Sequence, residues 1–421
     1  MHDTDDNPWK TKAIALDHFR WALLRERHGL FGSTLRFVRD ALLDTWFGLH
    51  AKCRLATAIE TESCDYLLLQ ASPKVIGLKR KKLLINALLE RGNRLVETAL
   101  QEPRDLCANR LLARPPYPTP LRYYGYAAHA TWIIERYQPR VLLNDRNGSL
   151  FSPFLRLSLA NRKCTLVHLA HATTVESSRR LSMNDYDYYL LFGPSSLQAL
   201  KTRALRFGTS TVLLTGSHMI DKSFDLPPAN QQARTLLVLG VGPDKEKEAG
   251  YQRTYELLSE WAREHPEYHV LVKRHPRSSV PFWQEAGQTL KNINVLPSDR
   301  SLAQALEQAS LVVNIMSNAV IEAGLAARPV IYCNLSDDRD IFNQEQFFGA
   351  AATTPSEFHS RVQAIENDFS AHVEQSRAFA LFHLAHGSQG LDITLRTLEA
   401  LLTHSELPKD VEQHVLPETA I

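Results

Sequence analysis

The chain has 421 residues and a mass of 47.7 kDa, with 44% hydrophobic and 22% charged residues. These proportions are typical of globular proteins and exclude a disordered chain, a collagen and a coiled-coil rod. Lys and Arg number 48 against 46 Asp and Glu, so the formal net charge is only +2. A charge this close to zero indicates no overall electrostatic drive towards nucleic acid, and we expect no nucleic-acid partner.

The compartment is predicted from cysteine usage and from the absence of targeting signals. The five cysteines are scattered and form no CxxC pair, which favours reduced thiols over a disulfide framework or a zinc site. The first residues, MHDTDDNPWK, lack the features of a signal peptide, and no apolar stretch approaches the ~18 residues that span a bilayer. We therefore expect a cytoplasmic protein, with contact at the inner face of the cell membrane left open.

Residues 1–135 are predicted to form a mostly helical N-terminal portion of the first domain. The segment 82–101 places Leu and Ala at helical spacing and is expected to be one helix. A proline-rich segment, 113–120, interrupts this portion, and residues 123–137 again have a helical pattern.

Short apolar runs alternate with amphipathic segments from about residue 136 onward. This alternation is typical of βαβ units and a parallel sheet, so residues 136–225 are predicted to be a Rossmann-like acceptor domain. The predicted strands are 140–145, 164–171, 188–193 and 211–216, and the helices between them are 153–162 and 195–208.

A polar segment with a double proline, 221–234, is predicted to link two domains, and the alternation then starts again. Residues 226–354 are expected to be a Rossmann-like nucleotide-donor domain, followed by C-terminal helices and a frayed tail over 355–421. The predicted strands are 234–242, 268–276, 293–297, 311–316 and 329–334, with helices at 251–265, 301–309 and 318–327. The fold class is therefore α/β, with tandem Rossmann-like domains, an interdomain cleft and a helical N-terminal portion.

Ligands of open α/β sheets bind where strands end, so the chemistry-bearing residues there are the candidates for a site. The strongest motif is KRHPRSS, which follows a predicted strand and places Lys273, Arg274, His275 and Pro276 at its end. Full charges and a ring N–H can hold a phosphate there. The alternative is an ordinary basic turn.

Two further motifs of the second domain are consistent with phosphate binding. Ser317 and Asn318 stand where a helix should begin, and Glu322 follows one turn later, within reach of a ribose or of the cap. Gly240 and Gly242 end another strand, where the lack of a side chain lets a diphosphate approach. Plain helix capping and a tight βα turn are the alternatives.

The first domain offers two candidate general bases at strand ends, and the sequence leaves the choice between them open. His171 lies within the motif HLAHATT of residues 168–174, and a histidine titrates near working pH. Asp145 is the rival base, next to Arg146, which could hold an acidic substrate. His168 and His218 are candidates for acceptor binding, with structural roles as the alternative.

The order of these pieces resembles the two-domain GT-B glycosyltransferases. More narrowly, residues 140–335 resemble bacterial surface-polysaccharide enzymes with cytidine-nucleotide donors: the Kdo and sialic acid transferases with their His-Pro motif, and the CDP-glycerol glycerophosphotransferases. The resemblance implies that His275 and Pro276 hold the donor phosphate and that Ser317 and Asn318 contact phosphate or ribose. In the same way, Glu322 is implied to contact the nucleotide sugar.

The resemblance also implies a reaction and a base. His171 occupies the place of the first-domain histidine of the teichoic-acid enzymes, and Asp145 that of the carboxylate base of the sialyltransferase-like group. The chain departs from the CDP-glycerol pattern at Ala172 and at residues 315–318. We expect an inverting, metal-independent glycosyltransferase that needs no cofactor and moves a Kdo- or sialic-acid-like sugar from a CMP- or CDP-linked donor. Its acceptor is expected to be a saccharide or lipid-linked molecule of capsule or lipopolysaccharide synthesis.

Two other function classes stay open on the sequence. One is an isomerase of the UDP-N-acetylglucosamine 2-epimerase kind, which shares the tandem plan, and the other is a binding protein with a degenerate site. A separate question is membrane contact, since residues 33–59 combine Leu, Phe and Trp with Arg and Lys, and residues 74–82 are strongly basic. A helical subdomain with solvated lysines is the alternative.

Overall fold

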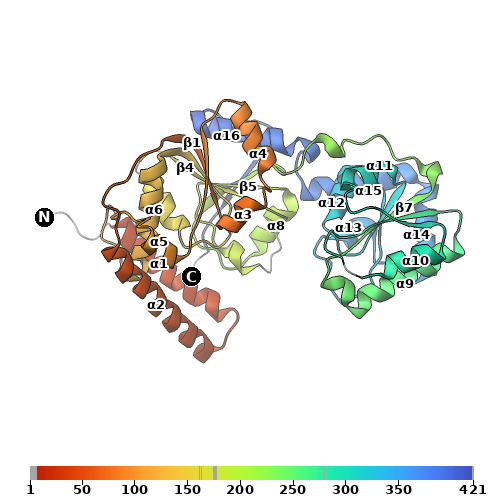
Figure 1. Ribbon diagram of the computed structural model, residues 1–421, viewed down its shortest axis with the longest axis horizontal. Helices are drawn as coiled ribbons and strands as arrows, with labels where there is room; N and C mark the ends of the chain where they lie inside the picture. The colour runs from red at the N-terminus through yellow and green to blue at the C-terminus, as the bar shows by residue number, and fades with distance from the viewer. Residues whose placement is uncertain (1–6, 161, 163, 174–177, 279, 420–421) are drawn as a thin grey trace. The chain divides into compact units, whose positions relative to one another are not determined.

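A computed structural model describes residues 7–160, 162, 164–173, 178–278 and 280–419 of the chain. The chain divides into two compact units (Figure 1). Unit 1 comprises residues 1–219 and 390–421, and unit 2 comprises residues 220–389. The first boundary falls beside the polar segment predicted to be a linker, whereas the return of the chain to unit 1 was not expected.

Unit 1 is built on a seven-stranded sheet of order β12-β6-β5-β4-β3-β1-β2. All neighbours pair in parallel except β12, which runs antiparallel to β6. Four of the strands overlap the segments predicted for the first domain. The strands are β1 (Cys64–Gln70), β2 (Leu95–Ala99), β3 (Pro139–Asn144), β4 (Thr165–Leu169), β5 (Tyr188–Leu191), β6 (Ser210–Leu214) and β12 (Glu412–Leu416).

The prediction of a mostly helical N-terminal portion is wrong in one respect, because β1 and β2 lie within it. The segment 82–101 is not one helix but helix α4 (Lys82–Glu90), a turn and strand β2. Gly92 breaks the helix with a φ of 81°, a left-handed conformation that glycine adopts without strain. Val96 and Thr98 then favour the strand because their β-branched side chains suit a pleated sheet.

Helices cover both faces of the unit 1 sheet. Helices α4 and α16 lie on one face, where Leu84, Leu88, Ile393 and Leu398 pack against the buried strands. Helix α7 lies against β4, and α6 in turn lies against α7. The helices are α1 (Pro8–Arg25), α2 (Leu30–Cys53), α3 (Pro73–Gly77), α4, α5 (Pro103–Ala108), α6 (Leu121–Tyr137), α7 (Ser152–Ala160), α8 (Pro194–Thr202) and α16 (Gly390–Thr403).

Unit 2 is a five-stranded parallel sheet of order β11-β10-β7-β8-β9. Each strand lies inside a segment that the sequence predicted to be a strand, because runs of Val, Leu and Ile buried on both sides are typical of parallel sheets. The strands are β7 (Thr235–Leu239), β8 (His269–Lys273), β9 (Ile293–Val295), β10 (Leu311–Asn314) and β11 (Val330–Tyr332).

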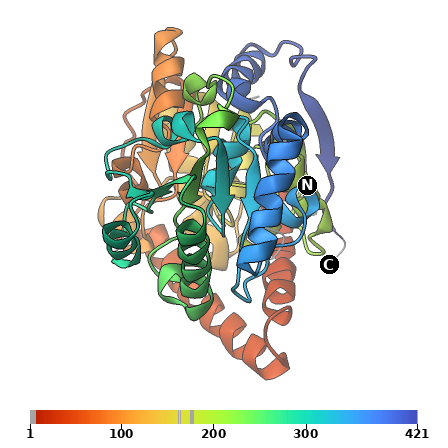
Figure 2. The same ribbon diagram turned by 90° about the vertical axis from the view of Figure 1, so that its right-hand side faces the viewer.

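Helices lie along both faces of this second sheet (Figures 1 and 2). On one face, Tyr255 and Trp261 of α9 and Phe358 and Val362 of α14 form a core with the strands. The helices are α9 (Ala249–Glu264), α10 (Phe282–Thr289), α11 (Leu302–Gln308), α12 (Ala319–Leu325), α13 (Gln344–Phe348), α14 (Pro355–Asn367) and α15 (Phe369–His383).

Residues 355–421 were expected to form one block of helices with a frayed tail, but the structure does not have this arrangement. Helices α14 and α15 complete unit 2, whereas α16 and β12 belong to unit 1. Gly390, the first residue of α16, lies so close to the loop after β6 that an added Cβ would stand 2.6 Å from the backbone nitrogen of Ser217. No helix in the described part of the chain is both long enough and apolar enough to cross a membrane.

Candidate active site

A cavity of about 400 Å³ lies in unit 2 at the carboxyl ends of its parallel strands. This is the edge where open α/β sheets bind ligands. It brings together six of the nine residues predicted to bind a donor; Gly242, Asn318 and Glu322 are not among its lining. The lining residues are Leu239, Gly240, Lys273, Arg274, His275, Pro276, Ser298, Asp299, Arg300, Ser301, Leu302, Ser317 and Ala319.

Gly240 allows β7 and β8 to end side by side. Its N–H donates to the carbonyl of Lys273 at 2.9 Å. A Cβ added at Gly240 would lie 3.0 Å from both Arg274 Cα and His275 N. The glycine is therefore needed for the close approach of the two strand ends. The sequence had suggested a different reason, the approach of a diphosphate. Nothing lies within 4 Å of a Cβ added at Gly242.

His275 is oriented by the turn that follows it. The backbone N–H of Arg277 donates to His275 Nδ1 at 3.1 Å. Because Nδ1 accepts this bond, the proton of the neutral ring is on Nε2, which is left as a donor. Ser279, the last residue of the motif, lies outside the described residues.

Three cationic side chains line the same cavity. Arg274 Nε is buried and has no hydrogen-bond partner among the described residues, while Lys273 Nζ lies 3.4 Å from the carbonyl oxygen of Ser298. No ion pair of Lys273, Arg274 or Arg300 occurs in the described part of the chain, although Asp299 also lines the cavity. Cations that no neighbouring carboxylate neutralises attract negative charge, so the cavity is suited to an anion with several oxygen atoms.

Helix α12 contributes Ser317 from the loop before it. The Ser317 N–H donates to Asn314 Oδ1 at 3.1 Å, and Asn318 stands at the N-cap position without a capping hydrogen bond from its side chain. Plain helix capping, the alternative role of these two side chains, is therefore absent. The helix has only seven residues, so we assign no phosphate binding to its dipole.

Glu322 lies one turn beyond Ala319, on the same face of α12. Burial raises the pKa of its carboxyl group to about 7, and its Oε2 is buried without a hydrogen-bond partner among the described residues. The group is therefore half-protonated near neutral pH and can donate or accept a hydrogen bond.

Unit 1 assembles a second polar cluster at the carboxyl edge of its own sheet. Asp145 follows β3, His171 follows β4 and His218 follows β6. Lys81, which precedes α4, completes the cluster: its Nζ lies 2.5 Å from Asp145 Oδ2, and both side chains are buried. Lys81 belongs to the strongly basic segment 74–82, but it is buried and is therefore neither a solvated lysine nor available to a membrane.

Within this cluster His171 is the accessible base. The backbone carbonyl and the carboxylate of Asp145 favour protonation of the His171 ring. Desolvation lowers the pKa of His171, and Lys81 lowers it further against the opposing effect of Asp145. The residue as a whole is exposed, so a neutral imidazole is presented to solvent.

Asp145 is buried, and its Oδ1 has no hydrogen-bond partner among the described residues. His218 is also buried, with Nε2 unpartnered in the described structure. Desolvation, together with Lys81 and His171, lowers the pKa of His218 to about 3, so its ring is neutral. Arg146 is exposed beside the cluster.

His168 is a structural residue, which corrects its predicted role in acceptor binding. The ring is fully buried, with Nδ1 3.0 Å from Asn144 Nδ2 and Nε2 2.7 Å from Asn147 Oδ1. It also stacks on Tyr186 with ring centroids 4.4 Å apart. Both ring nitrogens are occupied, so neither can reach an acceptor. Thr174, which ends this motif, is outside the described residues.

No cluster of three or more potential metal ligands occurs among the described residues, and metal independence stays a prediction. The sequence analysis missed Lys81 and the loop of residues 298–302. The only signal for the loop was its position directly after a predicted strand. No local signal identified Lys81, because its partner Asp145 is distant in the sequence.

No protein-family model matches the sequence, and a search of curated proteins finds no match. Several solved structures share the fold. A Listeria monocytogenes protein assigned as a UDP-N-acetylglucosamine 2-epimerase aligns over 82% of this chain and 99% of its own, with 12% identity and a TM-score of 0.52. A second UDP-N-acetylglucosamine 2-epimerase aligns over 83% and 99%, with 10% identity and a TM-score of 0.50.

The UDP complex of S. aureus MnaA aligns over 82% of this chain and 99% of its own, with 10% identity and a TM-score of 0.50. Identities this low show a common fold and leave activity undecided. The predicted fold class is confirmed in its GT-B-like α/β architecture of two Rossmann-like domains: the sheet of unit 2 is parallel, and that of unit 1 is parallel except at β12.

Proposed function

We propose that this protein is a glycosyltransferase that holds the phosphate of a nucleotide-activated sugar in the cavity of unit 2. The observation that carries the proposal is the basic lining of this cavity, in which Lys273, Arg274 and Arg300 lie together with His275 at the carboxyl ends of the strands. The likeness of the fold to a UDP-N-acetylglucosamine 2-epimerase and to S. aureus MnaA, which was solved with UDP, supports a nucleotide-bearing ligand.

In the proposed reaction His171 accepts the proton of an acceptor hydroxyl. The acceptor oxygen forms a bond to the anomeric carbon while the bond from that carbon to the phosphate oxygen breaks. The electron pair leaves with the nucleoside phosphate, whose charge is stabilised by Lys273, Arg274 and the Nε2–H of His275. The buried Lys81–Asp145 pair holds the carbonyl that orients His171, so Asp145 acts as a positioning residue.

The donor and acceptor are proposed from the sequence resemblance. The His275-Pro276 motif favours a CMP- or CDP-linked donor with a Kdo- or sialic-acid-like sugar, and a saccharide or lipid-linked acceptor of bacterial surface-polysaccharide synthesis. Transfer of glycerol phosphate from CDP-glycerol is the variant of this proposal that the same motif allows.

A second candidate function is epimerisation of a UDP-sugar. It is favoured by one observation, the fold likeness to UDP-N-acetylglucosamine 2-epimerases over more than four-fifths of this chain. The two functions differ in their products. A transferase releases nucleotide from its donor, slowly with water and faster with acceptor, whereas an epimerase returns an isomeric UDP-sugar.

The test is nucleotide binding by the full chain, measured by calorimetry with CMP, CDP, UDP, GDP and ADP. Arg274→Met and His275→Ala are each expected to weaken binding of the preferred nucleotide by roughly tenfold or more, since hydrogen bonds to charged groups contribute about 1.5–3 kcal/mol. Arg277→Met is the matched control, because Arg277 is an exposed neighbour whose side chain does not line the cavity.

Each result has a defined meaning. Tightest binding of CMP or CDP supports the cytidine donor, and tightest binding of UDP with sugar isomerisation supports the second candidate. Absence of nucleotide binding, or equal binding by the Arg274 and His275 variants and the wild type, overturns the site. Loss of turnover without loss of binding in His171→Gln supports the base assignment.

A further inference from the structure

Helix α2 exposes most of its large apolar side chains. In Figure 1 it forms a hairpin with α1 that projects from the sheet of unit 1. Single exposed apolar residues are ordinary, whereas a contiguous row of them marks an interaction surface. We call the exposed apolar residues of α2 the apolar stripe. Their exposed fractions range from 47% to 83%, and they are Leu30, Phe31, Leu35, Val38, Leu42, Leu43, Trp46 and Leu49.

The stripe lies on the face of α2 that points away from the protein. The opposite face packs on α6, where Gly48 is so close that an added Cβ would stand 1.9 Å from the carbonyl oxygen of Leu121. Phe47 and Ala51 are buried on this same side. Because only glycine fits at this contact, α2 cannot rotate to bury the stripe against the rest of unit 1.

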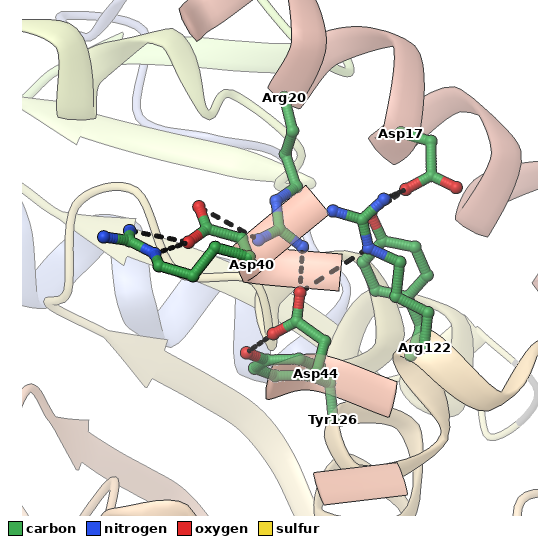
Figure 3. A network of polar contacts seen from close by, with 8 residues as sticks. Asp17, Arg20, Asp40, Asp44, Arg122 and Tyr126 are labelled. Atoms are coloured by element: carbon green, nitrogen blue, oxygen red, sulfur yellow. Dashed lines mark hydrogen bonds and ion pairs between the residues drawn. The ribbon is translucent and has the colours of Figure 1, made fainter. Parts of the chain in front are cut away.

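A network of charged side chains fixes this orientation (Figure 3). Asp44 of α2 pairs with Arg20 of α1 at 2.5 Å and accepts a hydrogen bond from Tyr126 of α6 at 2.7 Å. Arg122 of α6 pairs with Asp17 of α1 at 2.6 Å. The three helices are thus joined by buried or half-buried polar contacts, so the stripe is presented on a rigid support.

Basic side chains predominate beside the stripe. Its exposed charged neighbours on α2 are Arg36, Arg39 and Lys52. Of the two acidic residues of the helix, Asp44 belongs to the network, whereas the partly exposed Asp40 pairs with Arg39 at 2.7 Å, which leaves Arg36 and Lys52 as the basic border. Long basic side chains can extend from an apolar surface to anionic groups above it.

From this arrangement we propose that α2 docks unit 1 on an anionic lipid surface, with the apolar stripe in the acyl boundary and the basic side chains at the headgroups. Helices with an apolar face and a Lys/Arg-rich border bind in this way, lying in the plane of the interface. Anionic lipids add attraction for each basic residue near the surface. The inference does not depend on the proposed reaction, since it rests on α2 alone.

A second copy of this chain is the competing occupant, and the charges disfavour it. Phe31, Leu35, Val38 and Leu42 have the spacing of a coiled-coil seam. A two-fold interface would place the same basic border opposite itself, and the carboxylate beside it, Asp40, is already paired with Arg39. A lipid surface supplies the missing negative charge.

The experiment is sedimentation of the full chain with vesicles of phosphatidylcholine and phosphatidylglycerol, and with vesicles of phosphatidylcholine alone. The double variant Leu42→Ser/Trp46→Ser is expected to weaken partitioning by about tenfold or more, because two large apolar side chains no longer leave water. The matched control is Ile341→Ser/Leu381→Ser, which removes two exposed apolar side chains of unit 2. Arg36→Gln/Lys52→Gln is expected to lose the preference for anionic vesicles.

Light scattering of the same proteins without lipid reports the competing occupant. Wild type that binds anionic vesicles and is monomeric supports the proposal. Failure to bind, equal binding to neutral vesicles, or equal loss in the control variant overturns it. A wild-type dimer that becomes monomeric in Leu42→Ser/Trp46→Ser and ignores vesicles assigns the stripe to self-association.

Discussion

Glu322 is a carboxyl group whose ionisation opposes folding. Burial raises its pKa to about 7 in the folded chain, whereas the unfolded value is about 4.3. Below pH 4 both states hold the proton and the cost is absent. As the pH rises towards 7, the unfolded state loses its proton first, so the free energy of unfolding falls, by up to about 4 kcal/mol at pH 8.

The corresponding prediction is that Glu322→Gln removes part of this loss. The stability advantage of the variant over the wild type should grow from pH 5 to pH 8. Urea unfolding at these two pH values measures it. Glu285→Gln is the control because Glu285 is exposed. A stability difference between Glu322→Gln and wild type that does not change with pH would contradict the burial of this carboxyl group.

Lys81 and Asp145 form a buried pair in which each charge depends on the other. Lys81→Met leaves Asp145 buried without its cation, so we expect a loss of about 3–5 kcal/mol in the free energy of unfolding. Lys82→Met, at the exposed neighbouring lysine, should change stability little. The double variant Lys81→Met/Asp145→Leu should recover much of the loss; equal instability in the double variant would show that packing dominates.

At the scale of elements, Asp44 joins α1, α2 and α6 (Figure 3). Its side chain is 9% exposed, so its partners are largely shielded from water. Asp44→Ala removes the carboxylate that Arg20 and Tyr126 share. We expect a loss of about 3–5 kcal/mol in the free energy of unfolding, measured by denaturant titration. Glu374→Ala removes an exposed pair with Arg377 and should cost at most about 1 kcal/mol.

At the scale of the whole molecule, the end of the chain completes the sheet of unit 1. Strand β12 pairs with β6, its Leu416 is buried, and Asn184 donates to the Leu416 carbonyl at 3.0 Å. Deleting residues 406–421 uncovers β6 as an edge strand. We expect a lower melting temperature and concentration-dependent aggregation, measured by calorimetry and light scattering. Val415→Lys, at an outward position of β12, should preserve both properties.

The carboxyl edge of the unit 2 sheet was predictable from local patterns. Lys273 to Pro276 follow one apolar run and Ser317 follows another, and the carboxyl ends of parallel strands meet at one edge. The sequence could not show that Arg300 joins them or that Gly240 serves strand packing, because both depend on which strands are neighbours. Strand β2 was missed because the segment 82–101 keeps a helical spacing of apolar residues through its turn.

The amino-acid sequence by itself determined the alternation of strands and helices, the ends of most strands and the basic residues there, since these follow from local periodicity. Tertiary structure alone decided that Lys81 is the buried partner of Asp145, that His168 is sealed inside unit 1, and that β12 returns to the first sheet. Each of these joins residues far apart in the chain, and such contacts form only when the whole unit packs.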